Sequence, residues 1–153
     1  MTVTPPAAES MTLDLVGGFI GLMVRAGIGT WDDTGNGLYK AGDMGIVIGT
    51  MPQTPADLIS VTPYVAQVDV EPDVDVRAIQ VRIRTGSRDP RPAIGIVDRL
   101  HDTLNGLGPV TLGGWNVPLI WRNSLMDLGL DTSDRYEITD NYYLYVDKEP
   151  HHG

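Results

Sequence analysis

Residues 76–106 constrain the fold of this chain more than any other segment, because they predict a strand that leads directly into a helix. Apolar and polar residues alternate along residues 79–84, and a period of two places alternate side chains on opposite faces of a sheet. The apolar set is Ile79, Val81 and Ile83, and the polar set is Gln80, Arg82 and Arg84. Gly86 and Ser87 then predict the end of the strand.

A helix over residues 89–106 is predicted by its ends and by the spacing of its apolar residues. Asp89 suits the N-cap, and Pro90 suits the first helical position because its missing N–H needs no partner there. Asn105 and Gly106 predict the C-terminal end. One apolar face is formed by Ile94, Val97, Leu100 and Leu104.

The distribution of charge is uneven. The chain holds 11 Lys and Arg residues against 20 Asp and Glu residues, for a net charge of −9. Six of the basic residues lie in a short segment: Arg77, Arg82, Arg84, Arg88, Arg91 and Arg99. We therefore predict a local basic patch on an acidic body. The net charge disfavours a protein whose whole surface grips duplex DNA, whereas a local contact with DNA or with an acidic partner stays open.

Length and composition predict one folded unit. At 153 residues we expect a single α+β domain over residues 1–153, in which residues 1–6 and 149–153 are flexible tails. The lack of cysteine excludes a disulfide scaffold, thiolate catalysis and cysteine-bound zinc. The uncharged run at residues 15–24 is much shorter than the roughly 20 residues of a membrane span, so no membrane contact is expected.

The order of predicted elements is helix, strands, helix, strands. Residues 7–26 have a broad apolar helical face that also contains Gly17, Gly18 and Gly21. These glycines predict either close backbone packing against a sheet or a subunit contact. Further strands are predicted at residues 45–51, 58–70, 109–113, 117–124 and 136–147. This order favours a mainly antiparallel sheet that is packed on one face by two helices.

An acidic bend follows the strand at residues 58–70. It contains Asp69, Glu71, Asp73 and Asp75. Such carboxylates could hold a divalent cation, which leaves a small metal-dependent hydrolase as one alternative, although a solvated bend is the simpler interpretation. In a ring of subunits, this bend could also face the arginine strand of a neighbour. Otherwise the sequence contains no pattern typical of a catalytic site, an organic cofactor site or a metal site.

Tyrosines alternate in the last predicted strand. Tyr142 shares one face with Leu144 and Val146, which leaves Tyr143 and Tyr145 on the other face. Aromatic side chains on an open face suit a protein interface, and stacking on nucleic-acid bases or sugars is a second interpretation.

The chain resembles the tail terminator (minor capsid) proteins of long-tailed bacteriophages. The resemblance extends over nearly the whole chain. It includes the helix at residues 7–26, the strand IQVRIRTG at 79–86, the helix DPRPAIGIVDRLHDTLNG at 89–106, the tryptophan-containing strand at 117–124 and the aromatic strand at 142–146.

The resemblance implies a structural protein of the virion, without catalytic residues or cofactors. It implies a homohexameric ring at the head–tail junction, assembled in the cytoplasm of the host bacterium. Such a ring caps the tube that the tail tube protein forms and joins the tail to the head connector or head-completion protein. DNA passes through the ring without specific binding. A head-completion or connector adaptor is the alternative within the same class.

The residues expected to contact other subunits or partners come from these charged and aromatic segments. They are Arg77, Arg82, Arg84, Arg88, Arg91, Asp69, Glu71, Asp73, Tyr143 and Tyr145. The polar, turn-rich loops at residues 27–43 and 87–91 are the expected partner-contacting loops.

Overall fold

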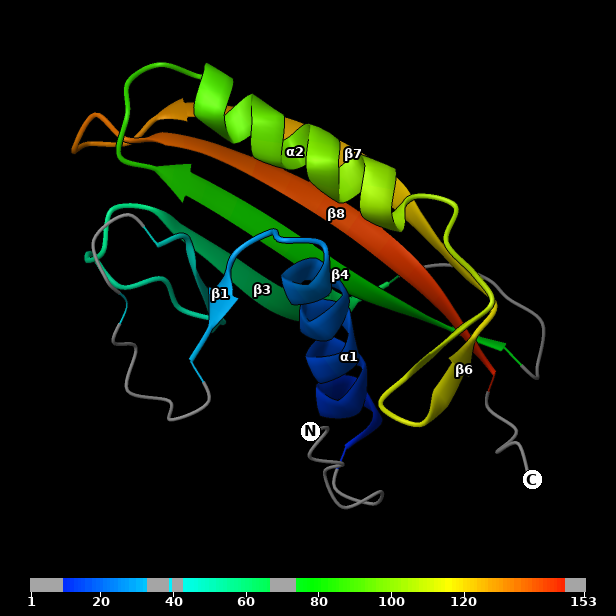
Figure 1. The fold of residues 1–153 in the computed structure, drawn as a ribbon. Helices are drawn as coiled ribbons and strands as arrows, with labels where there is room; N and C mark the ends of the chain where they lie inside the picture. The colour runs from blue at the N-terminus through cyan, green and yellow to red at the C-terminus, as the bar shows by residue number, and fades with distance from the viewer. Residues whose placement is uncertain (1–9, 33–38, 40–42, 67–73, 148–153) are drawn as a thin grey trace.

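The computed structural model describes residues 10–32, 39, 43–66 and 74–147. These residues form two helices and eight strands, which Figure 1 shows in chain order. The elements are α1 (Met11–Arg25), β1 (Thr30–Trp31), β2 (Gly45–Ile48), β3 (Leu58–Val65), β4 (Val74–Thr85), α2 (Arg91–Leu104), β5 (Val110–Leu112), β6 (Trp115–Val117), β7 (Leu119–Leu130) and β8 (Tyr136–Asp147).

Six of these strands form one sheet in the order β1-β2-β3-β4-β8-β7. The pairs from β3 to β7 are antiparallel, whereas β1, β2 and β3 run parallel to one another. The strands β5 and β6 form a separate antiparallel hairpin. The predicted α+β class is confirmed, with a sheet that is mostly antiparallel but mixed.

The core contains side chains from the sheet and from both helices. Ile79, Val81 and Ile83 of β4 are each at most 1% exposed, as the alternation in the sequence predicts. They belong to a single hydrophobic cluster with Phe19 of α1 and Leu100 of α2. Burying each such side chain stabilises the fold by about 1.5–3 kcal/mol.

Both helices begin with a side-chain contact. The Ser10 hydroxyl accepts a hydrogen bond from the Leu13 N–H, and α1 begins at Met11; residues 7–9 of the predicted helix lie outside the described residues. In α2 the predicted cap is shifted by one residue, because Pro90 occupies the cap position and the helix begins at Arg91. The Asp89 carboxylate still accepts from the Arg91 N–H at 3.0 Å. Neither described helix is long and apolar enough to cross a membrane.

Two glycines of α1 have different surroundings in the structure. A Cβ atom on Gly18 would lie 2.7 Å from Cβ of Leu112 in β5, whereas one on Gly17 would meet nothing within 4 Å. Close packing is therefore confirmed at Gly18, and its partner is the small hairpin. Gly17 is exposed and has no such contact.

The strand bounds match the sequence prediction best in β8, which covers residues 136–147 as predicted. The strand β3 ends at Val65, and Pro63 lies beyond the last residue that pairs with β2, so this side of β3 is locally an edge. The largest difference is β7, which continues six residues past the predicted end at Ser124. Two irregularities in its pairing, at Arg122/Ser124 and at Asp127/Gly129, break the alternation on which the prediction depended.

Candidate interaction surfaces

The arginines of residues 77–91 do not form a shared basic patch. Each of the five contacts a partner close to it: Arg77 pairs with Asp75, Arg82 with Glu137, Arg88 with Asp134 and Arg91 with Asp89, whereas Arg84 donates to main-chain carbonyls. Alternation also separates them, because Arg77 lies in register with Leu144 on the core side of β8. The predicted basic patch is therefore wrong, because four of these arginines are paired with carboxylates and Arg84 is buried among main-chain carbonyls.

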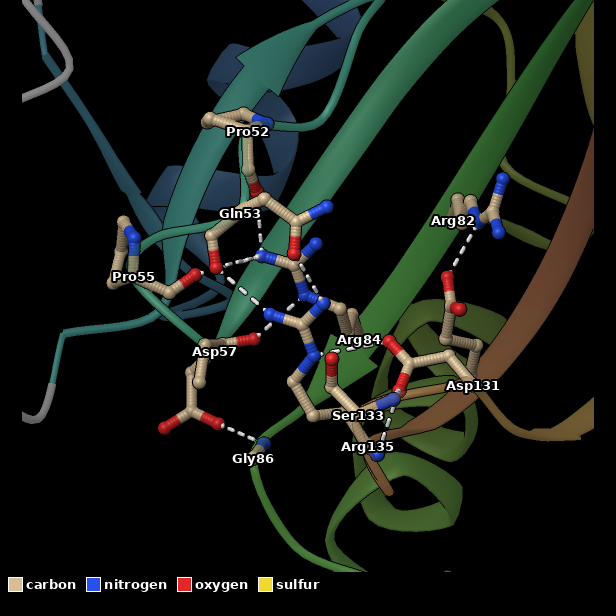
Figure 2. A network of polar contacts seen from close by, with 12 residues as sticks. Pro52, Gln53, Pro55, Asp57, Arg82, Arg84, Gly86, Asp131, Ser133 and Arg135 are labelled. Carbon is tan, nitrogen blue, oxygen red and sulfur yellow. Dashed lines mark hydrogen bonds and ion pairs between the residues drawn. The ribbon is translucent and has the colours of Figure 1, made fainter.

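Arg84 is buried, with 4% of its surface exposed. Its guanidinium donates to the carbonyl oxygens of Pro52, Pro55 and Ala56 at 2.7, 2.8 and 2.9 Å, as Figure 2 shows for the first two. Burial lowers the pKa of Arg84 from its usual value, and the nearby Arg135 acts in the same direction. The role of Arg84 in this chain is to hold the loop at residues 52–57 against β4.

A second arginine holds the same loop from the β7–β8 hairpin. Arg135 donates to the carbonyl oxygen of Gln53 at 2.7 Å and to its side-chain oxygen at 3.0 Å (Figure 2). The Asp131 carboxylate accepts from Arg135 Nε at 2.9 Å, and the main-chain N–H of Arg135 lowers the pKa of Asp131. On the other side of the loop, Asp57 accepts from the Gly86 N–H at 2.6 Å. Three loops at one end of the sheet are thus linked into one body.

This linked end presents exposed charge. Arg88 and Asp134 pair at 2.8 Å, and their side chains are 67% and 64% exposed. An exposed pair of this kind contributes little to stability, about 0–1 kcal/mol. The two side chains are therefore free to exchange this contact for one with a partner. The predicted contact loop at residues 87–91 belongs to this end.

The sheet face that carries Gln80 and Arg82 has a row of polar side chains. The Gln80 amide donates to the Asn141 side chain at 3.2 Å, and the Asn141 amide donates to the Ser124 hydroxyl at 2.9 Å. Beside this row, Arg82 Nε donates to Glu137 at 2.6 Å. The row crosses β4, β8 and β7 through hydrogen bonds between side chains.

An aromatic row lies next to the polar one. The register aligns Tyr64, Tyr143 and Trp121 across β3, β8 and β7, with Ala78 of β4 between Tyr64 and Tyr143. The centroid of the Trp121 ring lies 5.5 Å from the centroid of the Tyr143 ring and 4.3 Å from that of the Tyr145 ring. The predicted alternation is confirmed, since Tyr142 is buried while Tyr143 and Tyr145 are only partly buried. Such rings offer apolar area and hydroxyl groups to a partner.

Sequence reasoning missed a buried ion pair behind this face. Arg122 of β7 binds Asp140 of β8 through two nitrogens, at 2.8 and 3.0 Å, and the Tyr142 hydroxyl donates to the same carboxylate at 3.0 Å. Asp140 is fully buried. Burial raises its pKa, and the contacts from Arg122 act against that shift. The signal was present in the sequence, because Asp140 falls on the apolar side of the alternation in β8 and therefore needs a partner.

The acidic bend contributes only one described residue. Asp69, Glu71 and Asp73 lie outside the described residues, and Asp75 pairs with Arg77 at 2.9 Å. In the part of the chain that the structure describes, no three His, Cys, Asp or Glu residues gather as a metal would require. The described surface features are thus a linked loop end, a polar row and an aromatic row.

Comparison with known families identifies the class of protein. The sequence profile of the bacteriophage tail terminator proteins matches residues 23–148, from the end of α1 through β8. The chain belongs to the bacteriophage tail terminator family. As a member of this family it is a structural protein of the phage tail and a component of the virion.

Solved structures share the fold at low sequence identity. A chain from the virion of a native gene transfer agent particle is similar with a TM-score of 0.64 and 14% identity, over 91% of this chain and 99% of that one. A second solved chain is similar with a TM-score of 0.57 and 13% identity, over 93% of this chain and 100% of that one. Comparison with curated proteins gives no match. The structural likeness concerns the fold and covers both proteins almost entirely.

Proposed function

We propose that this tail terminator forms a homohexameric ring that closes the tail tube and joins the tail to the head connector. The observation that carries the proposal is the family match over residues 23–148, which includes all eight described strands.

We infer that both helices cover the same face of the sheet, so that the opposite face is free for partners. Support comes from the core, because Phe19 of α1 and Leu100 of α2 belong to one cluster with Ile79, Val81 and Ile83. In Figure 1 both helices lie in front of the sheet. The face that carries Arg82, Tyr143 and Tyr145 would then be the one that meets the tail tube or the connector.

The charges fit passage of DNA without binding. The chain carries a net charge of −9, and the arginines of residues 77–91 are engaged within the chain. A ring with acidic walls would repel the phosphates, so DNA would not adhere to it. Among the expected contact residues, Arg82, Arg88 and Arg91 are exposed and remain candidates, whereas Arg84 is used internally.

This proposal is tested by assembling phage tails with and without this protein. Tails assembled without it are expected to have no fixed length and to stay separate from heads, and adding the purified protein is expected to restore joining. Electron microscopy of both samples, with the protein located by a label, gives the readout. Tails of fixed length that join heads without the chain would overturn the proposal, and label on isolated heads in place of tubes would favour the head-side adaptor.

A further inference from the structure

The last eight residues of β7 form an unusual sheet edge. The strand β7 is the outer strand of the sheet, next to β8. The first half of its outer side is covered, because the Gly106 N–H donates to the Ile120 carbonyl at 2.7 Å and the Ile120 N–H donates to the Leu107 carbonyl at 2.8 Å. The Arg122 N–H is satisfied by the Asn105 side chain. For residues 123–130 the structure describes no such cover.

This uncovered half is apolar. Its exposed large side chains are Leu125, Met126, Leu128 and Leu130, which are 47%, 60%, 41% and 40% exposed. Edge strands normally carry lysine, proline or several charges that prevent pairing with another chain. Residues 123–130 contain neither lysine nor proline, and Asp127 is the one charged residue. Its carboxylate accepts hydrogen bonds from the Tyr136 hydroxyl and the Gly129 N–H.

The opposite edge of the same sheet has matching properties. There β1 pairs only with β2 in the described part of the chain, and Figure 1 shows it on the far side of the sheet from β7. Trp31 of β1 is 37% exposed, and Val24 of the adjoining α1 is 40% exposed. Arg25, the last residue of α1, is also exposed. One edge strand of the sheet thus has exposed apolar side chains and an acidic residue, whereas the other edge has an exposed tryptophan next to a helix whose last turn is apolar and basic.

We propose that residues 123–130 of one subunit bind the β1 edge of a second copy of this chain, so that neighbouring subunits meet edge to edge through their sheets. A contact between two different surfaces repeats from copy to copy and closes into a ring when the rotation allows it. Pairing of β7 with β7 would instead produce a two-fold dimer and leave both β1 edges free. The inference rests on the proposed function, because it names the surfaces through which the ring would form.

The lack of native cysteine allows a direct test by cross-linking. Leu128→Cys and Trp31→Cys place one thiol on each edge, and Ile94→Cys places a thiol on α2 at a similar exposure of 44%. Each single variant and each mixture is treated with short and long bis-maleimides, and the joined peptides are identified by mass spectrometry. We expect Leu128→Cys mixed with Trp31→Cys to give the cross-linked dimer. Ile94→Cys mixed with Trp31→Cys serves as the matched control and is expected to stay uncoupled.

A second measurement uses the unmodified protein, so that its result does not depend on whether the cysteine variants fold. Amide hydrogen exchange at residues 123–130 is expected to slow at least tenfold when the chain assembles. Rings that lack the mixed cross-link and this protection would overturn the inference and leave the proposed ring intact. Leu128→Cys that couples efficiently to itself would also overturn it, in favour of a two-fold dimer. A chain that stays monomeric, with or without tail tubes, would overturn the ring and the edge contact together.

Discussion

Arg122 and Asp140 show how one residue pair can decide the stability of the sheet. Asp140 is fully buried, and Arg122 supplies the opposite charge through two hydrogen bonds. Replacing Arg122 by Met would leave that carboxylate without its cation, so we expect a loss of about 3 kcal/mol in the free energy of unfolding. The double variant that combines Arg122→Met with Asp140→Leu should lose much less free energy of unfolding, because no buried charge remains. Urea denaturation of the two single variants and the double variant measures this coupling.

Two arginines of β4 give a second test at the scale of single residues. Arg84 donates to several carbonyls from a buried position, whereas the Arg82 side chain is 44% exposed and binds Glu137. Lysine lacks the planar fork of arginine, so Arg84→Lys is expected to lose about 2 kcal/mol. Arg82→Lys, the matched control, should change stability by less than about 0.5 kcal/mol. Limited proteolysis at residues 52–57 should accelerate only for Arg84→Lys, and equal acceleration in both variants would contradict the role given to Arg84.

At the scale of elements, the sequence predicted the helices and strands whose ends and faces are marked by residues close together in the chain. The helix α2 and the strand β8 were found because turn residues mark their ends and alternation or helical spacing marks their faces. The predicted apolar face of α2 is wrong at Ile94, which is 44% exposed, while Val97, Leu100 and Leu104 are buried. The second half of β7 was missed, because a bulge at Asp127/Gly129 interrupts its alternation. The partners of the arginines were missed for another reason. Arg82 binds a carboxylate 55 residues away, and only the order of the strands brings the two together.

The glycines of α1 provide a prediction at this scale. Gly17→Ala replaces glycine in a helix interior where an added methyl group meets nothing, so we expect stabilisation by about 0.5–1 kcal/mol. Gly18→Ala would push its methyl group against Leu112 and separate α1 from β5, which should destabilise the chain by about 1–3 kcal/mol. Thermal unfolding of the two variants measures both effects. Changes of the same sign in the two variants would contradict the packing of α1 on the hairpin.

For the whole molecule, net charge and assembly act against each other. Each copy carries a charge of −9, so copies in a ring repel one another, and salt screens that repulsion. If apolar sheet edges hold the ring, we expect association to strengthen or stay constant between about 0.05 and about 0.5 M salt. A ring held by the acidic bend of one copy on the arginine strand of the next would weaken over the same range. Sedimentation at several salt concentrations distinguishes the two.

The last prediction connects the β7 edge to the virion. Met126 is 60% exposed, so Met126→Lys should fold and melt like the unmodified chain while it places a charge in the middle of the apolar edge. Because that charge would be buried without a partner in the edge contact, we expect subunit affinity to fall at least tenfold, and joining of tails to heads to fall with it. Ile94→Lys adds the same charge to an exposed position on α2 and is expected to retain both. Full joining by Met126→Lys would mean that assembly does not use the open half of β7.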